Sequence, residues 1–140
     1  MTHKELLKQH IEQAFAEVPT PPSNNIAPHP CSECDEITQH FKDHSVESLD
    51  PAILDRHVWD LPLFSQEAKH YFITAWLKRS IDEINSDFTE ALIINFASNH
   101  RNAGYSAKQK CAIANYIEWV ALNYDELFDD AATALGYWNN

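Results

Sequence analysis

Five side chains between positions 29 and 44 could bind a metal ion: His29, Cys31, Cys34, His40 and His44. Thiolates and imidazoles are the ligands that zinc prefers. A finger-like site needs about a dozen residues between its cysteine pair and its histidine pair, whereas five separate Cys34 from His40. Because a helix through this segment would hold the two pairs apart, we expect no closed zinc site. His29, Cys31 and Cys34 remain as an alternative metal site.

Cys31 and Cys34 also have the Cys-x-x-Cys spacing of dithiol redox motifs, at the start of a predicted helix where backbone N–H groups lower a thiol pKa. Such motifs usually lie in a βαβ context, which is not predicted here. The neighbouring Glu33, Asp35 and Glu36 disfavour a thiolate. We therefore expect structural cysteines, one of them facing the core. A small metal- or thiol-dependent enzyme that uses the Cys31–Cys34 region is the alternative function.

Other catalytic patterns are missing from the sequence. Glu67 and His70 form one Glu-x-x-His step, the unit of di-metal sites in helical bundles, but the chain has no second copy. It also has no Gly-rich phosphate loop, no Gly-x-Ser-x-Gly elbow and no His-Glu-x-x-His pattern. We therefore predict no catalytic residue and no cofactor, and we expect the protein not to be an enzyme.

The charge balance predicts the kind of partner. The chain has 21 Asp and Glu against 10 Lys and Arg, a net charge of -11 on 140 residues. Small soluble domains usually carry a net charge of about 2 to 8 in magnitude, so solubility alone does not require this excess. Nucleic acids and anionic membranes are bound by clusters of Lys and Arg, which are scattered along this sequence. We expect no nucleic-acid or membrane binding, and a basic protein as the partner.

Two acidic clusters are the candidates for the surface that meets this partner. Acids in the first turn of a helix complement the helix dipole, by about 0.3 to 1 kcal/mol each, which explains some of them. Carboxylates beside aromatic side chains also have the composition of a binding hot spot. The predicted partner-binding residues are Asp82, Glu83, Asp87, Glu90, Tyr124, Asp125, Glu126, Asp129, Asp130 and Trp138.

The same sequence predicts an all-α fold. It has only two glycines and no Asn-Gly or Asp-Gly hairpin turn. Hydrophobic residues make up 44% of it, enough for one core, so we expect one compact domain over residues 1–140 with about six to seven helices. No apolar run approaches the ~20 residues that span a bilayer, and the N-terminus lacks a signal-peptide pattern. We expect a cytoplasmic protein.

Start signals and apolar periodicity place the helices. Thr2 with Glu5 and Ser106 with Gln109 have capping-box spacing, and Asp50 precedes a proline. A Pro-rich stretch over residues 19–30 should form an extended surface connection. The predicted helices run from about residue 2 to 18, from about 32 through Phe41, from 51 through Trp59, from 65 to about 84, from 106 through Val120, and from about 125 to Gly136. The apolar run over residues 91–96 could be a strand, but the start signal of Asp87 and Glu90 favours a helix there.

The chain resembles an uncharacterised family of small bacterial helical proteins. The resemblance rests on four stretches: residues 11–19, residues 31–36, residues 65–77 and residues 105–109. Where the family's commoner pattern has Leu-Pro ahead of Ala75, this chain has Ile73-Thr74. The resemblance implies no reaction. In size, acidity and lack of catalytic motifs the chain is also similar in type to bacterial toxin-immunity proteins.

Together these observations favour an acidic binding protein. We expect an immunity protein that neutralises a basic, nuclease-type toxin by covering its active surface. Carboxylates would meet the Lys and Arg that bind phosphate in the toxin, and aromatic side chains would anchor the contact. An adaptor protein is a further alternative.

Overall fold

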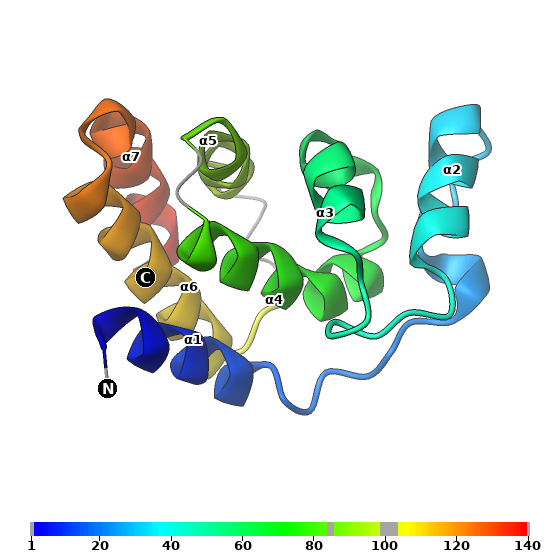
Figure 1. The fold of residues 1–140 in the computed structure, drawn as a ribbon, viewed down its shortest axis with the longest axis horizontal. Coiled ribbons are helices and arrows are strands. Elements are labelled where there is room, and N and C mark those ends of the chain that lie inside the picture. Colours follow the sequence, from blue (N-terminus) through cyan, green and yellow to red (C-terminus); the bar gives the residue numbers. More distant parts are fainter. Residues whose placement is uncertain (1, 84–85, 99–103, 140) are drawn as a thin grey trace.

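The computed structural model describes residues 2–83, 86–98 and 104–139. Seven α-helices and three short 3-10 helices pack together, with no strand among these residues (Figure 1), which confirms the predicted all-α bundle. In chain order the elements are α1 (His3–Ala14), η1 (Ser23–Asn25), α2 (Ser32–Phe41), α3 (Pro51–His57), η2 (Val58–Leu63), α4 (Gln66–Asp82), α5 (Ser86–Phe96), α6 (Ala107–Asn123), η3 (Asp125–Leu127) and α7 (Phe128–Trp138).

Side-chain caps fix several helix starts at the predicted residues. Thr2 and Ser106 form complete capping boxes with the side chains three residues later. Asp50 accepts a hydrogen bond from the Ala52 N–H, and Ser65 accepts one from the Ala68 N–H. Each such cap contributes about 1 kcal/mol by satisfying an N–H group that has no partner within the helix.

The predicted helix ends are less accurate. The first helix ends at Ala14, because residues 15–18 form tighter turns before Pro19, and a residue that precedes proline disfavours the α conformation. Gly136 lies inside α7 and does not end it, since the helix continues to Trp138. Trp59 was expected in the third helix, but it belongs to η2 and is 58% exposed.

The Pro-rich connection is more buried than an extended surface segment would be. The side chains of Ile26 and Ala27 are both buried. The Ser65 N–H donates to the Ile26 carbonyl at 2.8 Å, and the Ser65 hydroxyl donates to the Asn25 carbonyl at 2.6 Å. Ser65 therefore caps α4 and also anchors the connection that leads into α2.

Helix α4 crosses the middle of the molecule, with α2 and α3 towards one end and α5, α6 and α7 towards the other (Figure 1). Its Trp76 is fully buried, stacks on Phe41 of α2 and donates its indole N–H to the Leu54 carbonyl of α3 at 2.9 Å. The breadth of its apolar pattern correctly predicted a buried central helix. No helix in the described residues is long and apolar enough to span a membrane.

Candidate functional site

The predicted partner-binding residues fall into three groups with different surroundings. The two aromatic ones are buried: Tyr124 is 5% exposed and Trp138 is 2% exposed. The Trp138 indole N–H donates to the Phe96 carbonyl at 2.9 Å, and its ring packs edge-on against Phe96. The prediction that these two side chains lie on a binding surface is therefore wrong, because they pack in the core.

The first acidic cluster is partly neutralised within the chain. Asp82, at the end of α4, pairs with Lys8 of α1 at 2.6 Å, and Glu83 lies 3.8 Å from Arg79 one helical turn earlier. In α5, Asp87 is exposed and Glu90 is half-buried. Because two of its four carboxylates already have cationic partners, this cluster offers less free negative charge than its sequence indicates.

The second acidic cluster is exposed on the surface. Asp125, Glu126, Asp129 and Asp130 are all exposed at η3 and the start of α7, and none has an ion-pair partner within residues 2–83, 86–98 and 104–139. Two apolar side chains of the same stretch are also exposed, Leu122 at 73% and Phe128 at 54%. We call residues 122–130, at the α6–α7 turn (Figure 1), the acidic segment.

A partly apolar groove adjoins the acidic segment. It lies between α1 and α6 and has a volume of about 360 Å³. Leu6, which is 54% exposed, lines it together with Leu7 and Trp119, and Leu122 of the acidic segment also belongs to its lining. The acidic segment and the groove therefore share one exposed leucine.

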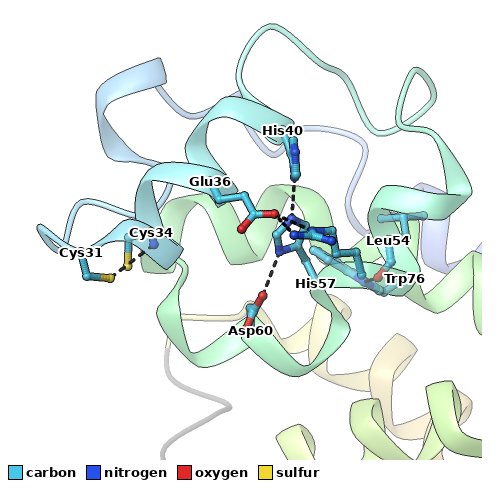
Figure 2. A network of polar contacts seen from close by, with 9 residues as sticks. Cys31, Cys34, Glu36, His40, Leu54, His57, Asp60 and Trp76 are labelled. Carbon is cyan, nitrogen blue, oxygen red and sulfur yellow. Dashed lines mark hydrogen bonds and ion pairs between the residues drawn. The ribbon is translucent and has the colours of Figure 1, made fainter.

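The alternative metal residues converge at the start of α2. The Nδ1 or Nε2 atom of His29 and the Sγ atoms of Cys31 and Cys34 all lie within 4.8 Å of one another, and we call these three residues the thiol cluster. Cys31 caps the helix, since its Sγ accepts the Cys34 N–H at 3.3 Å (Figure 2). The Cys31 N–H donates to the His29 carbonyl at 3.0 Å, which fixes the turn before the helix. Cys34 is fully buried, as predicted for one cysteine of the pair.

The two thiols of this cluster have opposite pKa shifts. The hydrogen bond between the thiols and the contact with His29 lower the pKa of Cys31 below its ordinary value. The same hydrogen bond, together with burial, raises the pKa of Cys34 to about 11. We therefore expect Cys31 to ionise before Cys34. All three cysteines of the chain are free thiols.

The other two candidate histidines, His40 and His44, do not join the thiol cluster. His57 at the end of α3 is 2% exposed, and its Nε2 lies 2.7 Å from Nδ1 of His40 on α2 (Figure 2). The donor atoms of these two histidines and of Glu36 lie within 4.8 Å of one another, and we call these three residues the histidine cluster. Glu36 also pairs with the Arg56 guanidinium. The fifth candidate, His44, contacts the Ser48 hydroxyl at 3.0 Å instead.

The histidine cluster was missed at the level of sequence. His57 and Asp60 are three residues apart across the α3–η2 junction, and this local spacing is visible in the sequence. The contact between His40 and His57 joins two helices across 17 residues, so only the packing of α2 against α3 reveals it. The five ligand-type residues of this region therefore divide between the thiol cluster, the histidine cluster and a separate His44.

Comparison with known proteins finds no matching family model, no matching curated protein and no matching solved structure.

Proposed function

We propose that this chain is an acidic binding protein that docks its acidic segment on a basic protein and inhibits it, as a toxin-immunity protein does. One observation carries the proposal. Four exposed carboxylates without an ion-pair partner among the described residues share a stretch of nine residues, 122–130, with two exposed apolar side chains.

Carboxylates without an ion-pair partner contribute most to the attraction of a basic protein, because a carboxylate that is already paired with a cation of its own chain attracts a second cation less strongly. Asp82 has Lys8 beside it and Glu83 has Arg79, whereas Asp125, Glu126, Asp129 and Asp130 have no ion-pair partner in the part of the chain that the structure describes. No Lys or Arg follows Lys110 in the sequence. A negative field at an exposed surface accelerates the association with a positively charged protein.

The apolar anchors of the proposed contact are Leu122 and Phe128. They take the role that the sequence assigned to Tyr124 and Trp138, which are buried. Aromatic side chains that become buried at the centre of an interface supply much of its binding energy, and charged groups around them speed the encounter. The groove between α1 and α6 extends the contact area from Leu122 towards Leu6.

The chemistry of the partner follows from that of the acidic segment. A nuclease binds the phosphates of its substrate with Lys and Arg, and carboxylates that occupy those cations exclude the nucleic acid. We therefore propose a basic, nuclease-type toxin as the target and occlusion of its active surface as the mechanism. The chain would act in the cytoplasm, where the toxin's substrates are.

The test begins with recovery of the partner. The chain is expressed with an affinity tag in its source organism, and the proteins it retains are identified by mass spectrometry. The purified partner is then assayed for nuclease activity with increasing amounts of the chain. We expect a basic protein whose activity is abolished at one chain per molecule.

A pair of charge-matched variants makes the test specific. The test variant replaces Asp125, Glu126, Asp129 and Asp130 with Asn or Gln, and the control variant makes four equivalent changes at exposed acids elsewhere, Glu17, Glu33, Asp43 and Glu47. Inhibition should be lost in the first and kept in the second. A retained partner that is acidic, or equal inhibition by both variants, would contradict the proposal.

A further inference from the structure

We propose that His29, Cys31 and Cys34 bind one Zn²⁺ ion, with a water molecule as the fourth ligand. This inference rests on the geometry of the thiol cluster and does not depend on the proposed function. The thiol cluster is at the start of α2, towards the opposite end of the molecule from the acidic segment (Figure 1).

The three donor atoms are close to the separations that zinc requires. With Zn–S bonds of about 2.3 Å and Zn–N bonds of about 2.0 to 2.1 Å, ligands of a tetrahedral ion are about 3.6 to 3.8 Å apart. In the structure each pair of donor atoms lies within 4.8 Å. The donor atoms therefore need to approach one another by about 1 Å at most to surround one ion.

The backbone that carries the ligands is already ordered. Pro28 and Pro30 flank His29 and restrict its neighbourhood. The Cys31 N–H donates to the His29 carbonyl at 3.0 Å, and the first turn of α2 fixes Cys34 relative to Cys31. Because the backbone of these residues is held in place by these contacts, binding costs less conformational entropy than it would in an extended segment.

The donor set fits zinc in charge and in solvent access. Two thiolates and a neutral imidazole carry two negative charges, which balance Zn²⁺, and the combination of two cysteines and one histidine leaves one coordination position open. Cys34 is fully buried, whereas Cys31 is half-buried and His29 is exposed, so water reaches that position. Binding converts both thiols to thiolates and releases their protons to the solvent.

The histidine cluster is the less suitable metal site. Two imidazole nitrogens on one tetrahedral zinc ion lie about 3.3 Å apart, whereas Nδ1 of His40 and Nε2 of His57 form a hydrogen bond at 2.7 Å. The third member, Glu36, already has a cation beside it in Arg56. These groups satisfy one another without an ion.

The experiment titrates the chain, without a histidine tag, reduced and freed of metal by a chelator, with Co²⁺ and then displaces the cobalt with Zn²⁺. We expect one Co²⁺ per chain, with a thiolate-to-cobalt charge-transfer band and the visible bands of tetrahedral coordination. Zinc should remove these bands at one equivalent and raise the thermal unfolding temperature, because it binds the folded chain preferentially.

Variants identify the ligands. Cys31→Ser keeps a good N-cap and His29→Gln changes an exposed side chain, so both should fold. Loss of even an outer-shell partner usually weakens metal binding by about 10- to 100-fold, so each of these variants should weaken it at least ten-fold. The matched controls are Cys111→Ser, which removes the exposed third cysteine, and His44→Gln, and both should bind normally.

Several results would overturn the zinc site. One is cobalt binding that neither Cys31→Ser nor His29→Gln weakens, or that Cys111→Ser weakens equally. Another is cobalt that binds without a thiolate-to-cobalt charge-transfer band. A third is loss of cobalt binding in His40→Gln, which would assign the ion to the histidine cluster. The variant with four neutralised acids in the acidic segment should bind cobalt like the unmodified chain. If the proposed function fails its own test, the cobalt titration still decides whether the zinc site exists.

Discussion

Asp60 Oδ2 lies 2.8 Å from Nδ1 of His57, an imidazole that is only 2% exposed. A carboxylate can only accept, so Nδ1 of His57 donates. In the neutral ring Nε2 is then an acceptor, and it faces Nδ1 of His40 at 2.7 Å. This row of hydrogen bonds, Asp60–His57–His40, gives both nitrogens of the buried His57 ring a hydrogen-bond partner and links α2 to the α3–η2 junction (Figure 2).

Replacement of Asp60 by alanine should destabilise the fold. The buried Nδ1–H of His57 would lose its acceptor, which costs about 1 to 3 kcal/mol of the free energy of unfolding. Asp60→Asn keeps an acceptor oxygen and should cost less. Urea unfolding measures both. The control is Asp55→Ala, which removes an exposed ion pair with Arg79 and should cost about 0 to 1 kcal/mol. Equal losses for Asp60→Ala and Asp55→Ala would show that the His57 contact contributes no more than a surface pair.

Two buried tyrosines should make the fold sensitive to alkaline pH. Burial raises the pKa of Tyr105 and that of Tyr116 above the ordinary value of 10.0. The folded chain therefore holds these protons more tightly than the unfolded chain, so their stabilisation is complete below pH 10.0 and is lost as the pH rises towards the folded pKa.

Tyr105→Phe should reduce this loss. Between pH ~9 and pH ~11 each buried tyrosine should lower the free energy of unfolding by about 1.4 kcal/mol. The variant should lack the contribution of Tyr105 to this decrease. Tyr116→Phe should show the same gain at high pH but be less stable at neutral pH, because its hydroxyl is 2.6 Å from that of Ser80. Urea unfolding at the two pH values checks both variants. If the free energy of unfolding falls between these pH values as steeply in both variants as in the unmodified chain, the two buried tyrosines are not the cause of the loss.

The two thiols at the start of α2 should differ in reactivity. Alkylation requires the thiolate, and the pKa of Cys31 is lowered while that of Cys34 is raised to about 11. In the Cys111→Ser variant, iodoacetamide near neutral pH should modify Cys31 and leave Cys34 intact, as measured by peptide mass spectrometry. Zinc should protect Cys31 if the proposed site exists. Preferential modification of Cys34 would contradict the order of ionisation.

Phe128 should be an energetic anchor of the proposed interface. Phe128→Ala should speed dissociation from the basic partner by roughly 30-fold, about 2 kcal/mol, as for a hot-spot aromatic. The free chain should keep its stability, because the ring is 54% exposed. Trp59→Ala is the control, since Trp59 is 58% exposed on η2 and does not belong to the acidic segment. Surface plasmon resonance measures the dissociation rate of both variants. Equal rates would show that Phe128 is not part of the interface.

Local signals in the sequence predicted most of the fold. Capping residues such as Ser65 and Ser106 act on N–H groups of the next three residues, so their effect is visible without tertiary contacts. The end of a helix depends more on packing, which is why α7 continues through Gly136 to the buried Trp138. The sequence could not show this because the hydrogen bond that holds Trp138 is made with Phe96, 42 residues away.

The candidate surfaces were predictable only in part. Composition identified an acidic chain, but only the structure distinguishes Asp82, which Lys8 neutralises, from Asp125, which has no ion-pair partner among the described residues. Exposure of an aromatic side chain likewise depends on which side of its helix faces the core. Phe128 and Trp138 both belong to α7, yet one is 54% exposed and the other 2%.

The association rate between the chain and its basic partner, measured against ionic strength, tests the central claim most directly. Exposed charges are screened over about 8 Å at physiological salt, so the rate should fall steeply as salt is added. It should also fall at low salt when Asp125, Glu126, Asp129 and Asp130 are neutralised, and less so for the control variant with four other acids neutralised. A rate that is independent of salt, or equal for the two variants, would contradict the claim that the acidic segment meets a cationic surface.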